Sequence, residues 1–123
     1  MRRLLATLAL AALTGSCGGG DGETGGVESF DAARGYYRDW GCPLCHGDGR
    51  EGTELGPALE NLEASWDAES LADYLRDPER FRRDDPRVRE LRTYYPEVTM
   101  PEYDRPEPER RLLAEWLLTS PPD

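Results

Sequence analysis

The stretch Cys42-Pro43-Leu44-Cys45-His46 decides how this chain is interpreted, because it places two thiols and one imidazole side by side in the sequence. The 123-residue chain has three Cys and one His, so this stretch holds two of the three thiols and the only imidazole. A chain of this length suits one small domain with a single core. We therefore expect one domain built around one site at these residues.

Three kinds of site use thiols at this spacing. A thiol–disulfide redox pair normally accompanies a βαβ pattern, and the sequence has no strand-like alternation. Half of a zinc site needs a fourth ligand, and the chain offers neither a second His nor a second Cys pair. Two thiols at this spacing followed by His can instead bond to one haem, with the imidazole reaching its iron. We interpret Cys42, Cys45 and His46 as the attachment site of one covalent haem c, with the other two sites as open alternatives.

Met100 is the candidate for the second axial ligand of that iron. It is the only Met apart from Met1, and it precedes Pro101, which favours an extended conformation in a loop. Soft thioether sulfur suits haem iron, and a His/Met pair raises the reduction potential relative to two nitrogen ligands. The alternative for a single Met is packing in the core.

The order of these motifs resembles a class I, mono-haem cytochrome c over about residues 29–119. That family continues from its attachment stretch into a Gly-Pro-x-Leu segment, matched here by Gly56-Pro57-Ala58-Leu59. The resemblance implies that the Pro57 carbonyl accepts a hydrogen bond from the non-ligating nitrogen of His46, which fixes the ring and raises its basicity.

The expected fold is all-α, a small cytochrome c domain over residues 29–123 with three to five helices around the haem. The resemblance also crosses the first and last helices, with Gly35 packed against Trp116, and so predicts that Gly35→Leu is damaging. The sequence predicts a first helix with its N-cap at Ser29 and a second with its N-cap at Asp67 that ends at Pro78. Residues 79–99 are expected to be mostly loop, with a short helix at 87–92. The last helix is expected to start within residues 105–108 and to stop at the stretch that begins with Thr119.

The first residues resemble a bacterial lipoprotein signal peptide, residues 1–16, with two Arg, a short apolar stretch and a small-residue exit. This ten-residue stretch, residues 4–13, is too short to span a bilayer. Cys17 would then be the lipidated first residue of the mature protein, which also accounts for the odd thiol. The alternative is that Cys17 is removed or stays a free thiol. Residues 17–28 are expected to be a Gly-rich tether that holds an exported, periplasmic domain at its membrane.

The chain is acidic, with a formal net charge of -10. Phosphates repel such a surface, so nucleic acid is not an expected partner. Redox protein partners are expected to present basic docking patches, since complementary fields steer encounter. Four arginines are candidates to pair with haem propionates, although charge runs are usually solvated: Arg76, Arg80, Arg82 and Arg83.

Taken together, these features predict a membrane-tethered one-electron carrier with His/Met-ligated iron, not an enzyme, and with no small-molecule substrate. One alternative is the haem subunit of a larger membrane-associated redox enzyme. Another is a ligand-binding or sensing haem protein, or a weak peroxidase, in which Met100 is absent from the iron or easily displaced.

Overall fold

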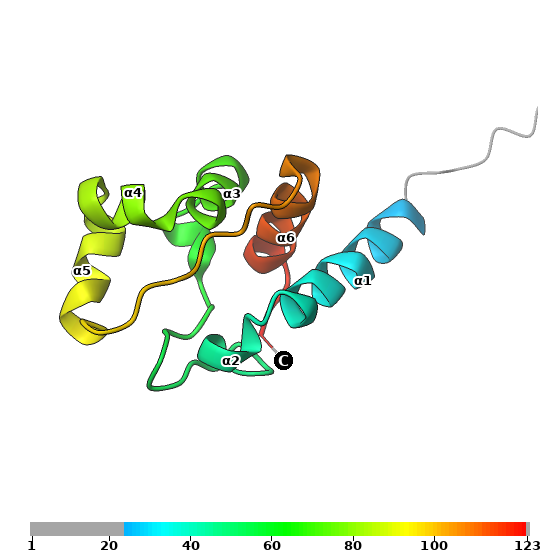
Figure 1. Ribbon diagram of the computed structural model, residues 1–123. Helices are drawn as coiled ribbons and strands as arrows, with labels where there is room; N and C mark the ends of the chain where they lie inside the picture. The colour runs from blue at the N-terminus through cyan, green and yellow to red at the C-terminus, as the bar shows by residue number, and fades with distance from the viewer. Residues whose placement is uncertain (1–23, 123) are drawn as a thin grey trace, which may run out of the picture.

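The computed structural model of the protein describes residues 24–122 (Figure 1). The predicted signal peptide, Cys17 and the first part of the tether lie outside these residues. The described part contains six α-helices and one 3-10 helix, and its only strand-like pairing is an isolated bridge between Thr53 and Gly56. The elements are α1 Thr24–Asp39, α2 Pro43–His46, the 3-10 helix η1 Leu62–Ala64, α3 Ala68–Arg76, α4 Pro78–Asp84, α5 Pro86–Tyr94 and α6 Glu107–Thr119. The all-α prediction is confirmed for this part, with more helices than the three to five expected.

The core lies where α6 packs against both α1 and α3 (Figure 1). Tyr37 of α1 and Leu113 of α6 are its largest fully buried side chains. Its other buried members come mainly from α3 and α6, and they are Ala33, Cys42, Leu71, Ala72, Leu75, Ala114, Trp116 and Leu117. Two residues of the predicted site, Cys42 within the core and Met100 at its edge, therefore contact the structural centre of the domain.

The predicted contact between Gly35 and Trp116 is wrong. A Cβ built on Gly35 would meet no atom within 4 Å. Helix α1 instead buries Ala33 and Tyr37, and the Tyr37 ring lies 5.6 Å from the Trp116 ring. The face of α1 that meets α6 is therefore the one that carries Tyr37, and Gly35→Leu is no longer expected to separate the two helices.

The helix starts show where local signals succeed. The Asp67 carboxylate accepts a hydrogen bond from the backbone N–H of Ser70 at 2.7 Å, and the Ser70 hydroxyl accepts one from the Asp67 N–H at 3.3 Å. This reciprocal pair is a capping box, and it confirms the predicted N-cap. Helix α6 also begins where the proline-rich stretch predicted. Helix α1, however, begins at Thr24 and not at Ser29, so residues 24–28 are helical although we expected them in the tether.

The prediction that residues 79–99 are mostly loop is wrong, because α4 and α5 occupy most of this segment, but the short helix predicted at 87–92 lies within α5. Each begins with Asp followed by Pro: the Asp77 carboxylate accepts from the Arg80 N–H, and the Asp85 carboxylate accepts from the Arg87 N–H. Pro is tolerated in a first helical turn because its missing N–H would have no partner there. Pro78 thus starts α4, whereas we expected it only to end the preceding helix.

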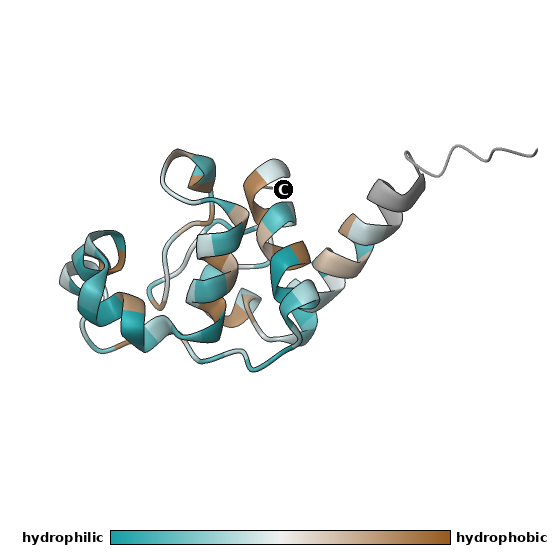
Figure 2. Ribbon diagram, turned by 90° about the horizontal axis from the view of Figure 1, so that it is seen from above, coloured by the Kyte–Doolittle hydropathy of each residue, from teal (hydrophilic) through white to brown (hydrophobic). Residues whose placement is uncertain are grey.

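Helices α4 and α5 pack against each other at the end of the molecule far from α1 (Figure 1). Figure 2 shows that this pair is largely hydrophilic. Within residues 24–122 no helix combines the length and the apolar character needed to cross a membrane.

Candidate functional site

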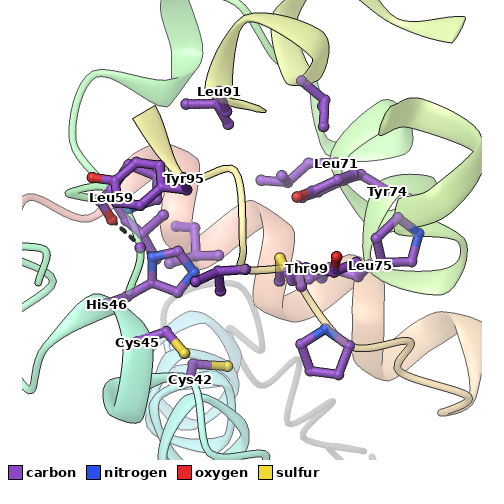
Figure 3. A pocket seen from close by; sticks show the side chains of 18 of the residues that line it. Cys42, Cys45, His46, Leu59, Leu71, Tyr74, Leu75, Leu91, Tyr95 and Thr99 are labelled. Carbon is purple, nitrogen blue, oxygen red and sulfur yellow. Dashed lines mark hydrogen bonds between the residues drawn. The ribbon is translucent and has the colours of Figure 1, made fainter. Parts of the chain in front are cut away.

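A cavity of about 530 Å³ opens beside the core and is the candidate site (Figure 3). Its volume falls within the range of about 300–1,000 Å³ typical of sites for small molecules and cofactors. Its walls come from the α1–α2 junction, the following loop to Leu59, α3, α5 and the segment around Met100. All five residues predicted from the sequence to bind haem line it: Cys42, Cys45, His46, Pro57 and Met100.

The two thiols lie together with His46 on one side of this cavity (Figure 3). Helix α2 is a single short turn, and it brings Cys45 and His46 next to Cys42. Neither thiol is in a disulfide, and Cys42 is buried while Cys45 is half-buried. Burial raises the pKa of Cys42 to about 11, against the opposing effect of a hydrogen bond with Tyr103. A reactive dithiol needs a lowered thiol pKa, so this environment disfavours a thiol–disulfide redox pair.

The His46 ring is oriented by a backbone carbonyl. Its Nδ1 lies 2.8 Å from the Pro57 oxygen, which is the hydrogen bond that the cytochrome c resemblance implied. A carbonyl only accepts, so Nδ1 carries the proton and Nε2 keeps its lone pair. Burial lowers the pKa of His46, and the hydrogen bond to Pro57 opposes this less strongly. The side chain is therefore held as the neutral imidazole that metal ligation requires.

Gly56 allows the chain to pass directly against the His46 ring. A Cβ at Gly56 would lie 3.0 Å from the Cys45 carbonyl oxygen and 3.2 Å from Nδ1 and Cε1 of His46. The turn that contains Thr53 is hydrogen-bonded to the same carbonyl, because the Thr53 hydroxyl donates to the Cys45 oxygen at 2.6 Å. The sequence suggested Gly56 only through the family resemblance, and the close approach gives it a physical reason.

Arg50 joins this loop to the end of α6, and sequence reasoning missed it. It is only 3% exposed, and it has a positive φ of 64°. Its guanidinium donates to the Ser120 carbonyl at 2.7 Å and lies 4.7 Å from the centre of the Trp116 ring. A cation is favourable at a helix C-terminus, where backbone carbonyls lack partners. Nothing in the sequence distinguishes this Arg from a solvated one, because its partners are far along the chain.

Tyr37 connects the same loop to α1. Its hydroxyl donates to the Gly47 carbonyl at 2.7 Å in a buried environment. Burial raises the pKa of Tyr37 well above its usual value, so the hydroxyl keeps its proton. The residue directly after His46 is thereby attached to the helix that forms the core.

Met100 lies in the segment between α5 and α6, is half-buried and packs at the edge of the core. Its neighbour Thr99 lies across the cavity from His46 (Figure 3). The Thr99 hydroxyl accepts a hydrogen bond from the Arg82 guanidinium. Further along, the Tyr103 N–H donates to the Leu75 carbonyl at 2.9 Å. Both interpretations of Met100, a ligand and a core residue, are compatible with this position.

Of the four arginines considered for propionate pairing, only Arg82 lines the cavity. Its Nε is buried and has no hydrogen-bond partner among the described residues. Arg76 pairs with Asp104 at 3.6 Å, and Arg83 pairs with Asp84 at 3.8 Å. Arg82 also contacts Glu79 at 3.9 Å, but because it alone of the four lines the cavity, an anionic group there would meet it before the other three.

Within residues 24–122, no group of three or more His, Cys, Asp or Glu side chains is arranged so that it could hold a metal ion. No protein-family model, curated protein or solved structure matches the chain. The cavity and the residues that line it are therefore the features that indicate a function.

Proposed function

We propose that this protein is a mono-haem c-type cytochrome that carries single electrons while tethered to a membrane through Cys17. The observation that carries the proposal is the cavity itself, whose lining includes the two thiols, the only His and the only Met of the described residues. The residues of this lining fit a haem: the volume is sufficient, most of the lining is apolar, and His46 is neutral with Nε2 not used by the Pro57 hydrogen bond.

Each of these residues has a definite role in the proposal. Cys42 and Cys45 would hold the haem through thioether bonds, and His46 and Met100 would ligate its iron. When bound, haem supplies a one-electron couple between ferric and ferrous iron. The protein tunes that couple: the Pro57 carbonyl orients His46 and raises its basicity, and the apolar walls keep water from the site. Arg82 is the candidate partner for a propionate.

Haem suits this site better than the two alternative chemistries. Burial of Cys42 raises its pKa, whereas a redox dithiol depends on a lowered one. A structural zinc site closes with four N or S ligands, and Cys42, Cys45 and His46 supply only three. Covalent haem uses both thiols and the imidazole at once. A three-ligand zinc site would use the same residues, but within residues 24–122 they do not form a group that could hold a metal ion.

The experiment that tests the proposal is a haem stain of a denaturing gel, run on the full chain matured in a host that attaches haem. We expect the wild-type band to stain and the Cys42→Ser/Cys45→Ser variant to lose the stain. Met100→Ala is the matched control, because it leaves both thioether bonds intact and should still stain. A wild-type band without haem would refute the proposal.

A ligand-binding or sensing haem protein is the second candidate function. It is favoured by the small number of contacts that hold the residues around Met100. The side-chain hydrogen bond next to Met100 is the one between Arg82 and Thr99, and neither residue lies in the core, since Arg82 is half-buried and Thr99 is exposed. Carbon monoxide separates the two functions: a carrier with firmly bound Met100 should bind it slowly or not at all when reduced at neutral pH. Prompt binding by the wild type would favour the sensing function.

A further inference from the structure

The charged residues that line the cavity have a net positive charge, whereas the chain as a whole has a net negative charge. Besides His46, they are three arginines and one glutamate, Arg82, Arg87, Arg92 and Glu90. All four belong to α4 and α5. The rest of the chain is strongly acidic, so the α4–α5 side of the cavity is a local exception.

The same exception appears along the sequence. Residues 76–92 contain seven Arg and five Asp or Glu, which gives them a formal charge of +2. The remaining residues have a formal charge of -12, so the whole chain has -10. Several of the acidic groups in this segment are already engaged. Asp85 contacts Arg87 at 2.6 Å, and Asp84 contacts Arg83 at 3.8 Å. Each of these ion pairs also engages an arginine, so the excess positive charge lies on arginines outside the ion pairs of the described residues, Arg80, Arg89 and Arg92.

We define the α4–α5 face by its exposed charged residues, which are four arginines, Arg80, Arg83, Arg89 and Arg92, and three acids, Glu79, Asp84 and Glu90, a formal charge of +1. Arg89 and Arg92 stand on α5, the helix that supplies the upper wall of the cavity through Leu91 (Figure 3). Neither takes part in an ion pair within the described residues. Apolar contact area is also available at the cavity, since Leu44 and Leu55 line it and are 78% and 50% exposed.

We infer that the α4–α5 face docks an acidic protein surface, so that the electron-transfer partner reaches the cavity from this basic side. The inference rests on the proposed function, because it takes the cavity to be the redox site. It reverses the expectation from net charge, which was a partner with basic patches. Local charge decides the approach because a charge farther than about 8–10 Å is largely screened at physiological ionic strength. Charges on the rim of the site thus steer an encounter more than charges on α1.

The test uses the haem-loaded full chain and one small anionic oxidant, hexacyanoferrate(III). In each reaction the reduced protein loses one electron and hexacyanoferrate(III) gains it, becoming hexacyanoferrate(II). We expect the second-order rate constant to fall as salt is added, as it does for opposite charges. The variant Arg89→Glu/Arg92→Glu should be slower by roughly tenfold at low salt and should reverse the salt dependence. The matched control is Arg34→Glu/Arg38→Glu, which makes the same charge change at exposed positions of α1 and should react like the wild type.

The outcomes separate this inference from the proposed function. Protein without stainable haem refutes the proposed function. Haem-loaded protein whose rate rises with salt, or whose two charge-reversal variants behave alike, refutes only the docking inference. If the glutamate variant fails to accumulate, Arg89→Gln/Arg92→Gln replaces it, and a rate equal to that of the wild type would refute the inference.

A second measurement identifies the class of partner. Acidic flavodoxin hydroquinone gives one electron to the oxidised protein, and we expect the wild type and the α1 variant to react faster than the α5 variant. Vesicles containing anionic phospholipid provide the contrast. If the α5 variant loses vesicle binding but keeps the wild-type rate with flavodoxin, the face binds lipid and the proposed protein partner is wrong.

Discussion

The loop that carries His46 and the segment that carries Met100 line one cavity, but the chain holds them very differently. The His46 loop is hydrogen-bonded to α1 through Tyr37 and to the end of α6 through Arg50. The His46 ring is also hydrogen-bonded to Pro57, later in the same loop. Residues 96–100 around Met100 are tied to the rest of the fold by one side-chain hydrogen bond, from Arg82 to Thr99. The ties of Tyr103 to Leu75 and of Asp104 to Arg76 follow only three and four positions after Met100. Local stability follows the density of such contacts. The His46 side therefore behaves as a fixed frame, and the Met100 side as the part that opens first.

The largest effect should come from breaking the frame at Gly52. Its φ is +84°, and an added Cβ would lie 2.6 Å from the backbone nitrogen of Ala58, so Gly52→Ala combines strain with a clash. We expect the free energy of unfolding to fall by roughly 2–4 kcal/mol, measured by denaturant titration. Gly35→Ala is the control, because its Cβ meets nothing, and it should be about 0.5–1 kcal/mol more stable than the wild type. Equal effects at the two glycines would contradict the account.

A smaller effect should follow from loosening the frame at Tyr37. The change Tyr37→Phe leaves the Gly47 carbonyl without its buried donor, at a cost of about 1–3 kcal/mol in unfolding free energy. Tyr36→Phe on the same helix is the control, since Tyr36 contributes a ring stacked 5.2 Å from Trp40, and phenylalanine keeps that ring. Thermal unfolding followed by circular dichroism measures both variants. If they lose the same stability, the hydroxyl of Tyr37 does not support the His46 loop.

The smallest effect should appear on the Met100 side, and only locally. Thr99→Val removes the acceptor of the Arg82 hydrogen bond and should destabilise the segment by about 0.5–1.5 kcal/mol. In haem-loaded protein, the Met-to-iron absorption band should then disappear at a lower denaturant concentration, while global unfolding is nearly unchanged. Thr93→Val, an exposed position on α5, is the control. A joint shift of both transitions would mean that the segment does not open separately.

Some residues that line the cavity could be predicted from the sequence because they are close together in the chain. The two thiols and His46 are neighbours in the chain, and Asp67 caps α3 through Ser70, only three positions away. Helices α4 and α5 also had local signals, the two Asp-Pro pairs, but we interpreted Pro78 only as a stop. Pro permits either outcome, and the residues after it decide which one occurs.

What could not be predicted depends on contacts between distant segments. Arg50 is buried because the end of α6 supplies carbonyls and a ring, and no local pattern records that. The face of α1 that meets α6 was misassigned, since Tyr37 and Gly35 lie two positions apart and differ in burial only through packing. The early start of α1 at Thr24 has no explanation in helix propensity, because Gly25 and Gly26 disfavour a helix.

The central claim is that one haem iron would be ligated by His46, on the firmly held side of the cavity, and by Met100, on the loosely held side. The visible spectrum of the oxidised, haem-matured full chain, compared with that of Met100→Ala, tests it most directly. The account predicts a Met-to-iron charge-transfer band in the wild type and its loss in the variant, with covalent haem retained in both. A spectrum that the substitution leaves unchanged would contradict the claim and would assign the sixth position to another ligand.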